Sequence, residues 1–444
     1  MVLKDIDELR RINDEELYRP HPLTPYQIKV LDNQLASVHS TMWNVPLGIK
    51  LKADVVDPQQ FLEAATRVIE AHPVLNTRIF VDVDGTFKQQ ICPGFAKCQL
   101  KHVSEQEMKD IIGQYPKPFD LINSHLSLVD IYATEENVYV FIDAHHIIYD
   151  GSTARVVFTE LVSLYEDLDC SMEDDLFPGF SVLEQRYLET EECQADRAYY
   201  EETYGGCSWC NMPEPDFPLE DVTAGNYRLS MGVSIDEMKE AERRCHTTRA
   251  RLANAAGLLA LAKHAGQKDV MITWIFHNRS EKWKANMVGM LIRELPIGIH
   301  ISELDTLDDL YKSMNKQMKE STKRCSYQYM VNHEEALIND SMEVNYKGSG
   351  IRFENALPCL GDLGQGAEML SLDELIDESE ARMEIDVFEA PEAEPDEQIY
   401  ISALYIASLY KEETIKGFFE LYRTMFQRLV KAEKTMTIAE LMAD

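Results

Sequence analysis

The sequence predicts an α/β protein built from two lobes. Short apolar runs rich in β-branched and aromatic residues, typical of buried strands, alternate along the chain with amphipathic helical patterns. A chain of 444 residues is too long for one ordinary hydrophobic core. An acidic run at 166–175, followed by Pro178 and Gly179, is the best candidate boundary. We expect a leader or linker at 1–20, a first lobe at 21–170, a linker at 171–180 and a second lobe at 181–444.

Capping and turn signals locate the elements of the first lobe. Thr24 can cap a helix that has Pro25 at its first position, and Asp57 opens a second helix. Asp84 and Gly85 form a hairpin turn signal. Strands are expected at 43–51, 78–81, 87–91, 126–132 and 138–144, and the second helix is expected to end near 71–73.

The second lobe is expected to begin with a charged helical region, followed by a loop rich in Gly and Pro. Thr247 and Thr248 can cap a strongly helical segment further along the chain. The predicted elements are helices at 182–204, 252–264, 413–431 and 437–442, strands at 270–275, 383–387 and 399–405, and an apolar run at 287–299.

The charge and composition exclude several classes of function. The formal net charge is −34, from 43 Lys and Arg against 77 Asp and Glu, which argues against nucleic acid or an anionic membrane as a partner. Hydrophobic residues make up 45% of the chain, which is enough for globular packing. No apolar run reaches the length of a membrane span and the first residues do not resemble a signal peptide, so the cytoplasm is the expected location.

The nine cysteines do not form a zinc-binding pattern. Cys207 and Cys210 are the only CxxC pair, and no second CxxC or His-x₃-His pair follows to complete four ligands. Cys245 and His246 supply two more ligands only if the fold brings them close. Reduced cytosolic thiols are the simpler interpretation, and no metal site is expected.

The most informative stretch is the run HHIIYDG at 145–151. It follows a predicted buried strand at 138–142 and precedes a helix that Ser152 and Thr153 can cap. Two histidines therefore stand where a strand gives way to a loop, and chemistry is often placed on such loops. The simplest alternative is a pair of core histidines satisfied by their neighbours, but the Asp-Gly pair at this spacing favours a functional motif.

These residue types suit acyl transfer. A histidine has an unperturbed pKa near neutrality and can act as a general base. Asp150 is near enough to shape the loop, although its partner can equally be a distant Arg, and the Gly151 N–H can meet a developing oxyanion. Because no Ser or Cys stands beside the two histidines as an obvious nucleophile, the expected reaction is direct attack of an amine or alcohol on a thioester.

The run at 145–151 matches the HHxxxDG signature of condensation domains from nonribosomal peptide synthetases. The resemblance covers nearly the whole chain, from about residue 20 to about residue 435. Further stretches that resemble family motifs lie at 22–27, 72–80, 196–205, 248–270, 277–279, 288–291 and 344–346.

The resemblance implies two lobes, each like chloramphenicol acetyltransferase, that form a V-shaped pseudo-dimer with a central tunnel. Donor and acceptor carrier proteins would dock at opposite ends, each presenting a thioester on a phosphopantetheine arm. The acceptor amine would attack the donor thioester and form a peptide bond. The resemblance further implies an adjacent adenylation domain, no cofactor bound by the domain itself, a monomer when excised, and a role in the biosynthesis of antibiotics or other secondary metabolites.

By resemblance, the catalytic motif comprises His145, His146, Asp150 and Gly151, and His146 is the residue that acts on the substrate. His145 and Asp150 are expected to support the site structurally, with Arg279 as the salt-bridge partner of Asp150. His146 either removes a proton from the amine or positions it. Tunnel positions are expected at Gly289, Arg293, Glu294 and Asn345.

Several positions depart from the family pattern. Arg293 and Glu294 stand where the family usually has Asn and Thr. Asn76 replaces a common Arg, and Asn278 replaces a common Gly. A charged pair near the tunnel is consistent with an unusual substrate or reduced activity, and equally with a salt bridge that leaves catalysis intact.

Other proteins with the same signature are the alternatives. A standalone acyltransferase would use an alcohol or amine acceptor with an acyl-CoA or acyl-carrier donor, although the linker-like residues 1–20 favour a domain of a synthetase. An epimerisation domain usually continues Gly-Val-Ser-Trp, unlike the run at 151–155, and a heterocyclisation domain has Asp in place of His145. A degenerate domain that only recruits a partner is expected to lack the second histidine, and His146 is present.

Overall fold

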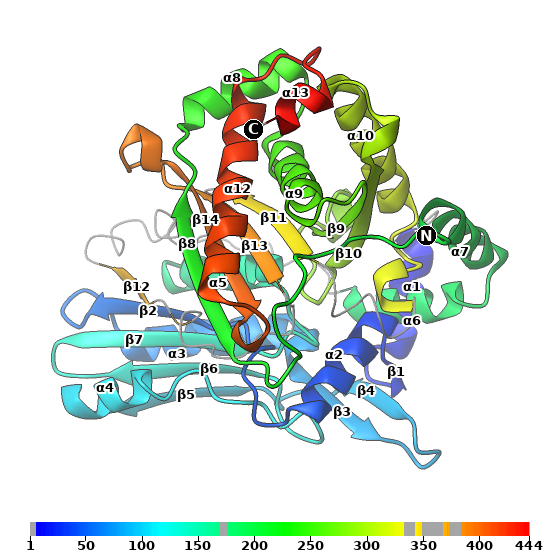
Figure 1. Ribbon diagram of the computed structural model, residues 1–444. Coiled ribbons are helices and arrows are strands. Elements are labelled where there is room, and N and C mark those ends of the chain that lie inside the picture. Colours follow the sequence, from blue (N-terminus) through cyan, green and yellow to red (C-terminus); the bar gives the residue numbers. More distant parts are fainter. Residues whose placement is uncertain are drawn as a thin grey trace.

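The computed structural model describes residues 6–167, 176–332, 342–348, 367–370, 372 and 383–443, which form three sheets and the helices packed around them (Figure 1). Within these ranges, no helix is long and apolar enough to cross a membrane. The elements of the first part of the chain are α1 (Ile6–Glu16), β1 (His21–Pro22), α2 (Pro25–Ala36), β2 (Leu47–Lys52), α3 (Pro58–Ala71), β3 (Thr77–Val81), β4 (Phe87–Ile91), β5 (Lys97–His102), α4 (Glu105–Ile112), β6 (Ser127–Ala133), β7 (Asn137–Ala144), α5 (Gly151–Tyr165) and α6 (Phe177–Tyr187). The elements that follow are α7 (Glu191–Tyr204), β8 (Ala224–Ser230), α8 (Ile235–Cys245), α9 (Arg249–Ala265), β9 (Asp269–Phe276), β10 (Arg293–His300), α10 (Leu307–Lys323), α11 (Tyr329–Asn332), β11 (Met342–Gly348), β12 (Glu368–Leu370), β13 (Met383–Glu389), β14 (Ile399–Ile406), α12 (Glu412–Lys431) and α13 (Ile438–Met442).

The sheets mix parallel and antiparallel pairs. The five-stranded sheet has the order β12-β2-β7-β6-β5, with β5 parallel to β6 and the other pairs antiparallel. The six-stranded sheet has the order β10-β9-β11-β13-β14-β8, with β11 parallel to both of its neighbours. A small antiparallel sheet has the order β1-β4-β3.

Strand β7 is the centre of the first lobe, and all of its residues are buried. Residues 138, 140, 142 and 144 face a core shared with α3 and α5, whereas Tyr139 and Phe141 face a smaller cluster that includes Met108 of α4. Alternate residues of a strand point to opposite faces, so covering both faces produces a continuous apolar run in the sequence. The HHxxxDG motif directly follows β7 and is therefore held in place by a rigid strand.

Helices α9 and α12, green and red in Figure 1, cover the six-stranded sheet and form a second core with it. Every residue from Leu252 to Ala262 on α9 is buried. Gly257 lies so close to the sheet that a Cβ at this position would be 2.9 Å from Val344 Cγ2. The Tyr422 hydroxyl of α12 donates to the backbone carbonyl of α9 at Ala253, over 3.1 Å.

Two segments from the second part of the chain join the first lobe. Strand β12 pairs with β2, with Met369 opposite Ile49. The apolar side chains of 287–291 belong to the same core as α3 and α5. The lobe boundary expected at 171–180 stays a prediction, and its first residues, 171–175, lie outside the described residues.

Two local predictions are corrected by the structure. Helix α5 is capped by Asp150, whose side chain accepts a hydrogen bond from the Thr153 N–H, and not by Ser152 or Thr153. The helical region expected at 182–204 is two helices, α6 and α7, because Thr190 caps the second one and starts a new helix.

Candidate active site

The motif at 145–151 forms a turn between β7 and α5. Two backbone hydrogen bonds, of 3.1 and 3.2 Å, hold residues 145–149 in this turn. The His146 N–H donates to the Trp43 carbonyl oxygen at 2.7 Å, which fixes the turn to the segment before β2. From Asp143 to Asp150, His146 is the one residue that is partly exposed, and all the others are buried. The turn therefore presents the imidazole of His146.

His145 is completely buried, and both of its ring nitrogens have partners. The Ile147 N–H donates to Nδ1 at 3.1 Å, so the proton of the ring is on Nε2, which lies 3.1 Å from the Gln34 side-chain oxygen. The Gln34 amide nitrogen donates to the carbonyl oxygens of Ser37 and Ser40, which turns its oxygen toward the histidine. Burial lowers the pKa of His145 to about 3. This ring has no nitrogen left for a substrate.

Asp150 is completely buried and connects the motif to the second lobe. One carboxylate oxygen accepts from the Thr153 N–H at 2.8 Å, and the other accepts from Arg279 Nη1 at 2.8 Å and the Leu291 N–H at 2.9 Å. Burial on its own raises the pKa of the carboxyl group, but Arg279 and the two N–H groups outweigh it and hold the pKa of Asp150 below its ordinary value. The contact between Arg279 and Asp150 is the one that the family resemblance implies.

Thr153 and Gly289 extend this network. The Thr153 hydroxyl donates to the Gly289 carbonyl oxygen at 2.8 Å and accepts from Arg279 Nη2 at 2.9 Å. Arg279 also donates to the carbonyl oxygens of Met287 and Gly289, at 3.1 and 3.2 Å. Gly289 has φ +150°, and a Cβ here would lie 2.3 Å from Phe177 Cδ2, so the position admits only glycine.

The surroundings of His146 differ from those of its neighbour. Its Nδ1 is buried without a hydrogen-bond partner among the described residues, and its ring meets Trp43 edge-on with centroids 5.8 Å apart. Burial lowers the pKa of His146 and the charge of Lys347 adds to this, whereas the charges of Asp150 and Glu294 oppose it. The expectation of a histidine with an unperturbed pKa is therefore corrected. The neutral ring, the form that accepts a proton, is favoured at neutral pH.

Charged side chains of the second lobe act on this site, and the sequence analysis did not single them out. Lys347 on β11 lies 3.5 Å from Asp386 on β13, and burial raises the pKa of Asp386 to about 7. Asn345, on the same strand, accepts a hydrogen bond from the Ile275 N–H at 2.9 Å and ties β11 to β9. Only the register of the six-stranded sheet brings Lys347 and Asp386 together, so no local pattern reveals this pair.

Gly151 is the first residue of α5 and is exposed. A Cβ at this position would meet no atom within 4 Å, so open space borders the glycine. The first N–H groups of a helix have no acceptor within the helix. The Gly151 N–H is therefore available to an external oxygen.

A family model for the Condensation domain matches residues 19–441. The chain belongs to the condensation domain family. Among curated proteins, tyrocidine synthase 2 of Brevibacillus parabrevis is 24% identical over 283 residues, which are 62% of this chain and 8% of that protein. Surfactin synthase subunit 1 of Bacillus subtilis (strain 168) is 22% identical over 345 residues, 73% of this chain and 9% of that protein. This condensation domain spans less than a tenth of these relatives, and the match confirms the predicted family and its acyltransferase class.

Solved structures share the fold of this condensation domain. The X-domain from teicoplanin biosynthesis superposes with a TM-score of 0.75 at 15% identity, covering 95% of this chain and 97% of that one. The first condensation domain of the calcium-dependent antibiotic synthetase, in complex with a substrate analogue, gives 0.71 at 14% identity, covering 95% and 99%. The epimerization domain from the third module of tyrocidine synthetase B gives 0.70 at 18% identity, covering 93% and 96%. These likenesses show the fold alone, and they confirm the predicted α/β class with chloramphenicol-acetyltransferase-like lobes.

The charged residues that distinguish this condensation domain from the family pattern have separate partners. Arg293 is 1% exposed and pairs with Glu184 on α6. Glu294 pairs with Lys29 on α2 at 2.7 Å and accepts a hydrogen bond from the Tyr26 hydroxyl. The two residues thus form two buried ion pairs. One pair connects β10 to α6, and the other connects β10 to α2.

The two asparagines that replace common family residues also have structural explanations. Asn278 has φ +54°, in the left-handed region that Gly adopts freely and Asn tolerates, and its side-chain oxygen accepts from Lys284 Nζ at 3.0 Å. Asn76 donates to the Ile69 carbonyl oxygen at 3.1 Å and accepts from the Ala96 N–H at 3.0 Å. The fold of the condensation domain therefore accommodates both.

Proposed function

We propose that this domain forms an amide bond between a donor acyl or peptidyl thioester and the α-amine of an acceptor aminoacyl thioester, each on the phosphopantetheine arm of a carrier protein. One observation carries the proposal. Among residues 143–150, His146 alone is partly exposed, and its buried Nδ1 has no hydrogen-bond partner among the described residues. His145 and Asp150 are buried and bonded. Family membership supports this reaction, and the length of the relatives supports carrier proteins and an adenylation domain as neighbours.

The reaction does not require a strong base. The acceptor nitrogen attacks the thioester carbonyl carbon, a C–N bond forms, the C–S bond breaks and the departing thiolate takes up a proton. An α-amine titrates near neutrality, so a weak base suffices to remove its proton. The lowered pKa of His146 keeps the ring neutral and able to do so. The N–H of Gly151, an exposed residue at the start of α5, is proposed to bind the developing oxyanion.

The test loads two carrier proteins with aminoacyl-phosphopantetheine thioesters and follows the dipeptidyl product on the acceptor by intact-protein mass spectrometry. Wild-type protein is expected to form the product, and His146→Ala to lower the rate by about 10²-fold or more, the usual contribution of general acid–base catalysis. His102→Ala removes an exposed histidine at the end of β5 and is expected to keep the wild-type rate. Normal turnover by His146→Ala would remove the role proposed for this residue.

Two further outcomes would assign a different function to the domain. Product formed only with an acyl-CoA donor or an alcohol acceptor would identify a standalone acyltransferase. Binding of a partner without any acyl transfer would identify a recruiting domain. A recruiting role is worth testing because one solved neighbour is the complex of the X-domain and OxyB from teicoplanin biosynthesis.

A further inference from the structure

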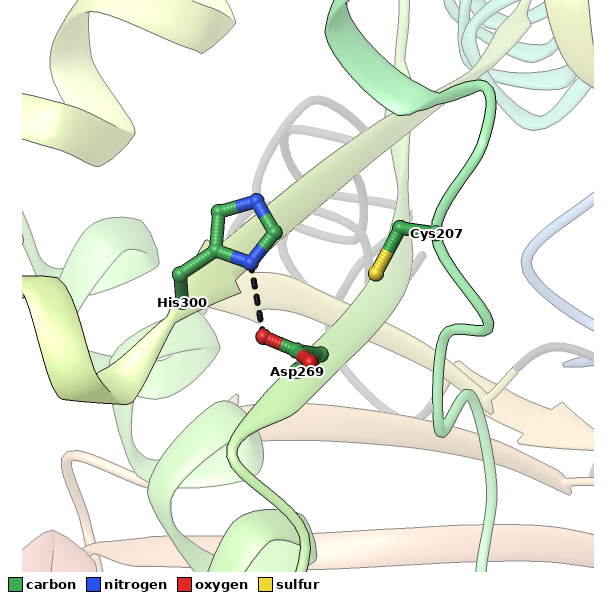
Figure 2. Close-up of side chains that lie close together, drawn as sticks. All are labelled: Cys207, Asp269 and His300. Carbon is green, nitrogen blue, oxygen red and sulfur yellow. Dashed lines mark hydrogen bonds and ion pairs between the residues drawn. The ribbon is translucent and has the colours of Figure 1, made fainter.

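Three side chains with metal-binding atoms meet at one edge of the six-stranded sheet, outside the HHxxxDG motif (Figure 2). Cys207 lies in the loop after α7, Asp269 is the first residue of β9 and His300 is the last residue of β10. One ligand atom from each residue lies within 4.8 Å of the other two. The residues are far apart in the sequence, so no ligand spacing could have revealed them.

Backbone hydrogen bonds bring the three residues together. Asp269 and His300 stand directly opposite each other in the antiparallel β9·β10 pair, where facing side chains lie close. The loop that carries Cys207 is fixed to β9 through Cys210, whose N–H donates to the Asp269 carbonyl oxygen and whose carbonyl accepts from the Met271 N–H, both at 2.9 Å. The positions of Cys207, Asp269 and His300 are therefore fixed by two paired strands and by a loop that is hydrogen-bonded to β9.

The His300 ring is held in one orientation. Its Nδ1 lies 2.7 Å from Asp269 Oδ1, and the Trp209 ring packs against the imidazole with centroids 4.8 Å apart. Trp209 is itself fixed, since its Nε1 donates to the Tyr204 carbonyl oxygen at 2.8 Å. It also occupies the space above Gly298, where a Cβ would lie 2.9 Å from the indole. The imidazole and carboxylate side chains are thus oriented before any ion binds.

We propose that Cys207, Asp269 and His300 bind a divalent cation of the zinc class. Zinc takes thiolate, imidazole and carboxylate ligands at about 2.0–2.3 Å, which in a tetrahedral site separates the ligand atoms by roughly 3.3–3.7 Å. The upper limit of 4.8 Å seen here requires a movement of roughly 1 Å. The half-exposed Cys207, on its loop, supplies that movement. A fourth position stays open to water, as in zinc sites with three protein ligands.

A thiol nucleophile is the competing interpretation of a Cys–His–Asp cluster. A thiol nucleophile needs an adjacent base, but among the described residues the hydrogen bond of His300 goes to Asp269 and none joins His300 to Cys207. A dication, by contrast, binds the thiolate and releases the proton. The CxxC partner does not join the cluster, because Cys210 Sγ points to the Met212 carbonyl oxygen, 3.7 Å away.

Cobalt(II) titration of the metal-free, thiol-reduced protein tests the proposal by absorption spectroscopy. Wild-type protein is expected to bind one Co²⁺ with a thiolate-to-cobalt charge-transfer band. Cys207→Ser is expected to lose this band, and His300→Gln to weaken binding at least about tenfold, since even changes behind the ligands cost about 10–100-fold. Cys98→Ser removes another partly exposed thiol, on β5, and is expected to keep the wild-type spectrum.

Thermal unfolding gives a second measurement that does not depend on acyl transfer. Zn²⁺ is expected to raise the Tm of wild-type protein and of Cys98→Ser, because an ion that binds only the folded state stabilises it. It is expected to leave the Tm of Cys207→Ser unchanged and to raise that of His300→Gln less than that of wild-type protein. A charge-transfer band that survives in Cys207→Ser, an equal rise in Tm for His300→Gln, or no band in wild-type protein would each overturn the site.

Discussion

Two adjacent histidines acquire different chemistry because one step along the turn changes what surrounds each ring. His145 packs edge-on against Phe119, with centroids 6.0 Å apart, and bonds to Gln34. Its pKa of about 3 keeps it neutral throughout the physiological range. His146 meets the Trp43 ring edge-on and is partly exposed. Position in the turn, not residue type, therefore decides which imidazole is available to a substrate.

Replacing Asp150 with Ala is expected to destabilise the protein by about 3–5 kcal/mol, because it leaves Arg279 as an unpaired interior charge. Urea unfolding at neutral pH measures the loss. Because the pKa of Asp150 is lowered, its stabilising contribution is fully present there and disappears only as acid protonates the carboxylate. Asp57→Ala, which removes the exposed cap of α3, is the matched control and is expected to cost only about 1 kcal/mol. An Asp150→Ala protein that is inactive yet as stable as wild type would make Asp150 catalytic.

The sequence was sufficient to select the motif but not its supporting residues. HHxxxDG stands out by composition and spacing, and the family resemblance points to Arg279. Gln34, which bonds to His145 Nε2, and Trp43, which borders His146, belong to ordinary helical and strand patterns. Their roles depend on tertiary contacts across the lobe, which no local pattern contains.

At the scale of elements, strand β10 explains how two neighbouring charges can both be buried. Adjacent residues of a strand point to opposite faces, so Arg293 and Glu294 cannot pair with each other. Arg293 meets Glu184 on one side, and Glu294 meets Lys29 on the other. The sequence identified both residues as unusual, but their partners lie on separate helices and could not be predicted from it.

Replacing Glu294 with Gln is expected to move the acidic limb of the pH–rate profile to lower pH. A base loses activity as the pH falls through its pKa, and the Glu294 charge raises the pKa of His146. Without that charge the ring stays neutral to lower pH, with a shift of less than about one pH unit. The measurement is kcat/KM for peptide-bond formation across the acid range.

Glu281→Gln is the matched control for this prediction. Glu281 forms a similar ion pair, with Lys284 at 2.7 Å, but its charge is not among those that shift the pKa of His146. The acidic limb of this variant is expected to coincide with that of wild type. A shift to higher pH in Glu294→Gln, or equal shifts in the two variants, would contradict the assigned effect of Glu294.

Local signals predicted most elements because caps and periodicity are properties of a few neighbouring residues. Thr24, Asp57 and Thr248 cap α2, α3 and α9 as expected. The cap of α5 was missed because Asp150 performs two tasks, accepting from Thr153 at the start of the helix and from Arg279 across the lobes.

At the scale of the molecule, the two hydrophobic cores are connected by segments of the second part of the chain that pack against the first lobe. Chain length predicted two lobes, and the comparisons confirm the fold class. The pairing of β12 with the edge of β2 could not be predicted, because a strand of three residues is too short to show a hydrophobic periodicity. The described links between the lobes are this strand, the ion pairs of Arg293 and Glu294, and the ion pair of Asp150 with Arg279.

Replacing Gly48 with Val is expected to detach β12 from the first lobe. A Cβ at Gly48 would lie 2.8 Å from Leu372 Cδ1 and 3.2 Å from Leu370 Cβ, so a branched side chain has to push both leucines away. The edge of β2 then faces solvent, and amide hydrogen exchange along Leu47–Lys52 is expected to accelerate. Because each lobe keeps its own core, urea unfolding is expected to separate into two transitions.

Lys50→Ala tests whether the backbone pairing or the side-chain charges of β12 couple the lobes. It removes only the solvent-accessible ion pair with Glu368, at 2.9 Å, which is worth about 0–1 kcal/mol. Exchange along β2 and the single unfolding transition are therefore expected to stay as in wild type. If Gly48→Val also unfolds in one transition with β2 fully protected, then β12 does not couple the lobes, and the buried ion pairs of Arg293, Glu294 and Asp150 would have to carry that coupling.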